Sequence, residues 1–310
     1  MEERFYVKNK NIFILAIIAC FLWGSAFPSI KIGYELFRVG EEDVYSKLVF
    51  AGYRFLFAGI IVLVYKIIKT KSGFRLSKRN ILSLILLGIL QTSLQYTFFY
   101  IGLAYTTGVS GSVINGTGTF FSIILAHFIY KDDKITKNKI IGCILGFLGV
   151  LLVSFQDGSD AINYKIIIGD ICVLISTIMA SIANIYSKKL VQTIDSYVVT
   201  GFQLSIGGAM LLITGYVLGG ELSVYSTSSV ILLIYLALIS SVAYLLWAQL
   251  LKYNKVSKIE FFKFLIPVFG TILSGIILNE DIFRLNTLLA LILVSLGIAL
   301  SNTKNNFLQI

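Results

Sequence analysis

The polar side chains with the clearest spacing lie inside two long apolar stretches, 107–130 and 260–278. In the first stretch they recur every three or four residues and so share one helix face: Ser112, Asn115, Thr119 and Ser122. The same spacing in the second stretch joins Glu260, Lys263, Pro267 and Gly270. A lysine ammonium on such a face can hold an anionic group of a substrate, which is the role we predict for Lys263. An ion pair between Lys263 and Glu260 is the structural alternative.

Other polar and aromatic side chains also stand within apolar runs. They are Gln91, Gln95, Tyr96 and Tyr100 in one run and Ser240, Tyr244 and Trp247 in another. Amide, hydroxyl and indole groups without partners are unfavourable in lipid, so these side chains are expected to face a cavity or to bond another helix. Trp23 stands in mid-span, away from the membrane interface where tryptophan is usual, and is predicted to form a cavity wall, with simple packing as the alternative. The predicted substrate-binding residues are therefore Trp23, Gln91, Gln95, Asn115, Thr119, Tyr244, Trp247 and Lys263.

Two prolines interrupt apolar runs and remove a backbone N–H. Pro28 leaves the carbonyl of Gly24 without its helical donor, and Pro267 does the same to the carbonyl of Lys263. Both positions are therefore predicted to kink their helices, either as the lining of a substrate cavity or as purely structural bends.

Two cations in these runs are given structural roles. Lys31 lies near the outer end of the first run and is expected to reach the membrane interface as an anchor. Arg54 lies about two turns into the second run, where pairing with Glu35 or Asp170 is favoured over contact with a substrate.

Several kinds of site are not supported. The NGTGTF run at 115–120 is glycine-rich, but no strand precedes it and no GK[ST] follows, so it is not a phosphate loop. His127 is the single histidine, and Cys20, Cys143 and Cys172 are far apart in apolar runs. The sequence therefore predicts no metal site, cofactor or disulfide framework, and no nucleophile–base pair for catalysis.

The composition is that of a membrane protein with many spans. Of 310 residues, 57% are hydrophobic and 14% are charged, against about 25% charged in soluble domains, and the mean hydropathy is +0.86. A span needs about 20 apolar residues. The predicted fold class is all-α integral membrane, with ten transmembrane helices at 12–36, 46–68, 81–104, 107–130, 139–156, 167–188, 197–218, 229–251, 260–278 and 286–303.

The net charge of +10 is unevenly distributed over the predicted loops. Most lysine and arginine residues fall on the side that holds both termini, and the other side holds Arg38, Lys47, Lys165 and Arg284. Basic loops stay in the cytoplasm, so both termini are predicted to be cytoplasmic. The charge is thus explained by topology, and nucleic acid is not an expected partner.

The end of the first half of the sequence aligns without gaps with the end of the second half, at an offset of 148 residues. This offset pairs Tyr105 with Tyr253, Gly149 with Gly297, and the acidic pair 132–133 with 280–281. Five spans per half is an odd number, so the second half must enter the membrane upside down. The predicted domains are two five-helix inverted repeats, 1–156 and 157–310, within one membrane domain, an architecture of alternating-access transporters.

Four features of the sequence are typical of one known family: LWGSAFPSIKIG at 22–33, Arg54, AYTTGVSGS at 104–112 and LIPVFGTILSGIILNED at 265–281. In these features the chain resembles the drug/metabolite transporter superfamily, in particular its EamA-like branch of ten-helix carriers. Two positions depart from the family pattern: Thr119 stands where proline is frequent, and Asp132 stands where glutamate is usual.

This resemblance implies a secondary transporter in the plasma membrane that moves small metabolites, such as amino acids or related compounds, without ATP. The expected partners are a small-molecule substrate and the lipid bilayer; the sequence does not indicate an oligomeric state. Two alternatives come from other classes: a membrane enzyme acting on lipid-linked substrates, and an interaction subunit that transports nothing. An enclosed polar cavity at mid-membrane distinguishes transport from both.

Overall fold

The computed structural model describes residues 2–40, 42–71, 73–74, 76–105, 111, 114–154, 164–278 and 285–302. Within these residues the regular structure is helical throughout. The helices are α1 (Glu2–Tyr6), α2 (Asn9–Leu36), α3 (Val44–Thr70), α4 (Lys78–Gly88), η1 (Ile89–Leu94), α5 (Gln95–Tyr105), α7 (Gly118–Ile129), α8 (Lys137–Ser154), α9 (Tyr164–Val191), α10 (Ser196–Val217), α11 (Thr227–Tyr253), α12 (Val256–Glu260), η2 (Phe261–Phe264), α13 (Leu265–Leu278) and α14 (Leu285–Asn302).

Seven helices in the described part of the chain are long and apolar enough to cross a membrane. Each of the seven coincides with a predicted span, because α4, η1 and α5 run on as one segment and so do α12, η2 and α13. The other three predicted spans, 107–130, 139–156 and 286–303, contain α7, α8 and α14. That these three helices also cross the membrane stays a prediction.

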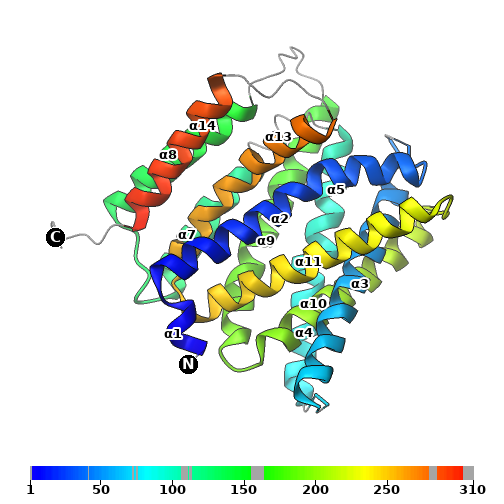
Figure 1. Ribbon diagram of the computed structural model, residues 1–310, viewed down its shortest axis with the longest axis horizontal. Coiled ribbons are helices and arrows are strands. Elements are labelled where there is room, and N and C mark those ends of the chain that lie inside the picture. The colour runs from blue at the N-terminus through cyan, green and yellow to red at the C-terminus, as the bar shows by residue number, and fades with distance from the viewer. Residues whose placement is uncertain are drawn as a thin grey trace.

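The helices form two outer pairs with a central group between them (Figure 1). Helices α8 and α14 pack together at one edge of the molecule, and α3 and α10 pack together at the opposite edge. Between these pairs, α2 contacts α11 and α13, while α9 contacts α5 and α7. Side chains from α2, α5 and α11 can therefore meet in the middle of the molecule.

Glycines allow the two outer pairs to approach closely. A Cβ on Gly59 would lie 2.4 Å from the backbone nitrogen of Ser205, and a Cβ on Gly142 would lie 2.7 Å from the carbonyl oxygen of Gly297. No side chain fits at either distance, so helix backbones meet directly, as small residues permit in membrane helices. Gly142 precedes Gly146 in a GxxxG spacing, which is typical of such close packing.

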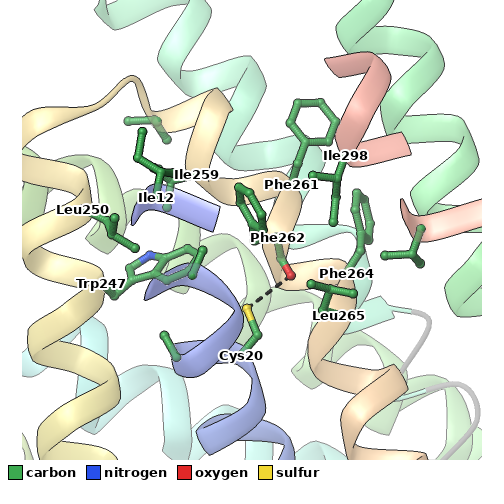
Figure 2. Packing of buried hydrophobic residues seen from close by; sticks show 14 of the residues in the cluster. Ile12, Cys20, Trp247, Leu250, Ile259, Phe261, Phe262, Phe264, Leu265 and Ile298 are labelled. Carbon is green, nitrogen blue, oxygen red and sulfur yellow. Dashed lines mark hydrogen bonds between the residues drawn. The ribbon is translucent and has the colours of Figure 1, made fainter. Parts of the chain in front are cut away.

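The largest buried apolar cluster joins α2 and α11 to the segment around η2 (Figure 2). Trp247 projects from α11 beside α2, and Phe261, Phe262 and Phe264 extend from η2. The thiol of Cys20 donates to the carbonyl oxygen of Phe262 over 3.2 Å. This cluster holds the second half of the chain against the first helix.

Two segments depart from α-helical geometry, which the sequence did not predict. Ile89–Leu94 is a π-helix, and Phe261–Phe264 is a 3₁₀-helix that ends three residues before Pro267. Pro267 cannot supply the N–H that an α-helix would give to Lys263, which fits a change of winding there. Pro28 is buried within α2, which continues on both sides of it.

Candidate substrate-binding site

Six aromatic side chains meet near the middle of the molecule, and we call them the central aromatic cluster: Trp23 of α2, Phe55 of α3, Tyr96 and Tyr100 of α5, and Tyr244 and Trp247 of α11. The ring of Trp23 lies 5.4 Å from that of Tyr244 and 5.1 Å from that of Trp247, centroid to centroid. Phe55 lies 4.5 Å from Tyr96. These distances are those of favourable aromatic contacts. The cluster brings together Trp23, Tyr244 and Trp247, three of the predicted substrate-binding residues.

A hydrogen bond between the hydroxyls of Tyr96 and Tyr244, 2.9 Å long, crosses the centre of the cluster. These two residues are 148 positions apart, the offset at which the two halves of the sequence align. The contact therefore joins a residue of the first half of the sequence, 1–156, to a residue of the second half, 157–310.

One end of the cluster carries Lys263. Its Nζ lies 2.9 Å from a carboxylate oxygen of Glu260 and 5.1 Å from the centroid of the Trp247 ring. Glu260 is fully buried, and neither of its carboxylate oxygens accepts a hydrogen bond of regular geometry in the described part of the chain. The ion pair named as the structural alternative is thus present. Contact between Lys263 and a substrate stays a prediction.

The other end of the cluster carries Arg54, which is 3% exposed. Its Nε donates to the hydroxyl of Ser240 over 2.8 Å, and its guanidinium carbon lies 4.9 Å from the Phe55 ring. The expected ion pair with Glu35 or Asp170 is wrong: within the described residues Arg54 meets no carboxylate. The cause is the direction of the side chain, which points across to α11.

Buried amides and hydroxyls beside the π-helix bond to neighbouring helices. The Gln91 amide donates to the side-chain oxygen of Asn184 over 3.2 Å, and the Gln203 amide donates to the hydroxyl of Thr92 over 3.0 Å. Gln91 thus makes the interhelical bond that was the alternative to facing a cavity. Its own side-chain oxygen is buried without a hydrogen-bond partner in the described part of the chain. Gln95 is half-buried.

The predicted polar face near α7 is divided by the fold. Thr119 is buried and its hydroxyl donates to the backbone carbonyl of Glu260 over 3.5 Å, which joins α7 to α12. Ser122 is also buried, whereas Asn115 is exposed. Ser112 lies outside the described residues. Substrate contact by Asn115 and Thr119 stays a prediction, and so does contact by Gln91 and Gln95.

A separate polar cluster closes one end of the molecule, outside the spans. Asp133 in the α7–α8 loop is buried, forms a 2.7 Å ion pair with Lys139, and accepts a 3.0 Å hydrogen bond from the backbone N–H of Ser257 and another from its hydroxyl. Burial alone would raise the pKa of the Asp133 carboxyl, but the bonds from Lys139 and Ser257 outweigh it and hold the pKa below its usual range. The carboxylate thus fixes the loop to the start of α12.

Known sequences match this chain over nearly its whole length. The sequence model of the EamA-like transporter family matches residues 10–155 and 167–303. An uncharacterized transporter of Archaeoglobus fulgidus is 29% identical over 93% of this chain and 97% of its own. The uncharacterized transporter YyaM of Bacillus subtilis is 27% identical over 86% of each chain.

The fold also has a counterpart among solved structures. One crystal structure, 14% identical in sequence, superposes with a TM-score of 0.77 over 94% of this chain and 96% of that one. At this identity the likeness concerns the fold alone. The family match, by contrast, covers both halves of the sequence and the residues that form the central aromatic cluster. The chain belongs to the EamA-like transporter family.

Proposed function

We propose that the protein is a secondary transporter that carries a small solute across the plasma membrane by alternating access. The single observation that carries this proposal is the central aromatic cluster: aromatic rings, hydroxyls, the buried Arg54 and the half-buried Lys263 are gathered where the halves 1–156 and 157–310 meet. Transporters built from inverted repeats bind their substrates at such a boundary. A non-transporting subunit has no need of polar groups buried at its centre.

The helix contacts support the two-fold relation that this mechanism requires. Exchange of the halves replaces α2, α5 and α7 by α9, α11 and α13, respectively. The contact of α2 with α13 then becomes that of α9 with α7, and the contact of α2 with α11 becomes that of α9 with α5; all four are present. In addition, α8 and α14 begin and end at residues 148 apart.

In the proposed topology both termini and the loop after α3 are cytoplasmic. The test uses a background in which Cys20, Cys143 and Cys172 are alanine, with one new cysteine at Lys71 or at Ser223, both exposed. In intact cells an impermeant thiol reagent is expected to label Ser223→Cys and to spare Lys71→Cys. The reverse pattern would overturn the orientation.

Amino acids and related compounds are the proposed substrate class, as expected from the family. Purified protein is reconstituted into liposomes that contain a mixture of unlabelled amino acids. The uptake of external amino acids labelled with ¹³C, in exchange for the internal ones, is followed by mass spectrometry. We expect at least one labelled amino acid to accumulate faster than in protein-free liposomes, without ATP. If every labelled amino acid accumulates at the same rate in liposomes with protein as in protein-free liposomes, this substrate class is contradicted.

A further inference from the structure

Arg54 is a buried cation that makes one hydrogen bond and has no counter-ion among the residues that the structure describes. Its Nε donates a hydrogen bond to the Ser240 hydroxyl, and that hydroxyl donates a hydrogen bond to the carbonyl oxygen of Leu236 over 2.7 Å. The terminal nitrogens of the guanidinium, with four N–H groups, make no hydrogen bond or ion pair with the described residues. Arginine is always charged in proteins, so this charge cannot be removed by loss of a proton.

An unpaired charge in the middle of a membrane protein is strongly unfavourable unless something supplies the opposite charge. Within the described residues no ion pair joins Arg54 to a carboxylate, and its charge acts on the tyrosines Tyr34, Tyr100 and Tyr244. Tyrosine hydroxyls are neutral and can donate hydrogen bonds to an anion. The free guanidinium N–H groups have the fork geometry that holds a carboxylate through two parallel hydrogen bonds.

The surroundings of Arg54 also indicate what the rest of a ligand would be. Phe55 packs against the guanidinium, and the rings of Tyr244 and Trp23 continue the surface away from it. The Nε1–H of Trp247 is buried without a hydrogen-bond partner in the described part of the chain. Such a surface accommodates an apolar, preferably flat, body attached to the anionic group.

We infer that Arg54 binds the carboxylate of a small organic acid whose apolar body lies against Trp23 and Tyr244. This inference rests on the proposed function in one respect, that the bound acid is the transported solute. Lys263 at the other end of the cluster is neutralised by Glu260, so Arg54 carries the net positive charge of the site.

The test exploits the two tryptophans of the chain, Trp23 and Trp247, both of which belong to the central aromatic cluster. Tryptophan fluorescence, excited at a wavelength that the probes do not absorb, is titrated in purified full-length protein. The probes are benzoate, phenylacetate and 3-phenylpropanoate, each compared with its neutral amide. At least one acid should change the fluorescence saturably, and its amide should not. If no acid does so, or if acid and amide bind alike, the inference is overturned.

Arg54→Gln removes the charge and keeps an amide donor, and Arg38→Gln removes an exposed arginine as the matched control. Loss of a charged hydrogen bond corresponds to an affinity roughly 10- to 150-fold weaker, which is expected for Arg54→Gln and not for Arg38→Gln. Unchanged binding by Arg54→Gln would overturn the inference. If this variant does not fold, the acid–amide comparison on the unmodified protein decides alone.

Transport assays separate this inference from the proposed function. If an acid binds in a manner that depends on Arg54 but the liposome assay finds no transported solute, the binding site stands and the transport proposal fails. If the protein transports a solute without a carboxylate, and Arg54→Gln transports it equally well, the transport proposal stands and the inference fails.

Discussion

The two ends of the central aromatic cluster each carry a cation, but they are electrostatically different. The Nζ of Lys263 lies 2.9 Å from the carboxylate of Glu260, three residues earlier in the same helical segment. Arg54 is held by the neutral hydroxyl of Ser240. Among the described residues, the Lys263 charge therefore has a carboxylate partner and the Arg54 charge has none. A row of aromatic rings, from Trp247 through Trp23 and Tyr244 to Phe55, joins the two ends.

The comparison teaches that a charge inside a membrane span does not by itself mark a binding residue. A buried ion pair is nearly neutral in energy when complete, because the attraction between its members offsets the loss of their hydration. Removal of one member leaves the other uncompensated. By contrast, removal of a charge that has no partner relieves an unfavourable state, unless a ligand normally supplies the partner. Stability and binding should therefore respond in opposite ways at the two ends.

The largest expected effect is on stability at the Lys263 end. Lys263→Met keeps the length of the side chain and leaves Glu260 as an unpaired, fully buried carboxylate. We expect a loss of about 3–5 kcal/mol in the free energy of unfolding, measured by SDS unfolding in mixed micelles. Arg54→Gln should change the same quantity far less. A larger loss at Arg54 than at Lys263 would break the comparison.

The double variant Glu260→Gln, Lys263→Met is the control for this prediction. It removes both charges, so it should recover most of the stability that Lys263→Met loses. Its transport then decides the role of Lys263: recovery assigns the lysine to the ion pair, and continued impairment assigns it to the substrate.

Asp133, in the loop between α7 and α8, is another buried charge, and its carboxylate is paired with Lys139. Asp133→Asn weakens charged hydrogen bonds from Lys139 and Ser257 and should lower the free energy of unfolding at pH 7 by about 1.5–3 kcal/mol. Because the pKa of Asp133 is lower in the folded protein than its ordinary 3.8, its contribution is complete above that value and is lost as the pH falls through the folded pKa. The difference between wild type and variant should therefore shrink below about pH 4. A pH-independent difference would contradict this account.

The smallest expected effect concerns the hydroxyls between the two ends. Tyr96→Phe removes one side of the Tyr96–Tyr244 hydrogen bond and keeps the ring. We expect a loss of about 0.5–1.5 kcal/mol in the free energy of unfolding. The equivalent variant Tyr244→Phe breaks the same bond and should lose a similar amount. A double variant whose loss equals the sum of both would show that the bond contributes nothing.

The sequence predicted the membrane helices because apolar length is a local property, and seven spans appear as long apolar helices. The repeat offset of 148 residues also relates Tyr96 to Tyr244, but neither this pair nor its contact was predicted from the sequence. The predicted partner of Arg54 was wrong. The partner of a side chain depends on which helix faces it, and Ser240 is far from Arg54 in the sequence. The π-helix at Ile89–Leu94 has no comparable local signal.

Phe55 belongs to the central aromatic cluster but was not predicted from the sequence. It follows Arg54 in an apolar run and looks like any lipid-facing phenylalanine, yet it is fully buried against Tyr96 and Tyr244. Asn115 illustrates the opposite case, because its polar character suggested a buried face and it is exposed. Spacing shows which side chains share a face, while only the packing of helices decides which face is inside.

The central claim is that Arg54 binds an anion because no carboxylate in the described part of the chain neutralises it. Ser240→Asp tests this claim directly, since it places a carboxylate where the serine hydroxyl now meets the Arg54 Nε. Ser240→Asn is the comparison, equal in size and uncharged. The measurement is the affinity of each variant for 3-phenylpropanoate, from the tryptophan fluorescence titration. We predict that Ser240→Asp binds the acid at least roughly tenfold more weakly than Ser240→Asn; equal affinities would contradict the claim.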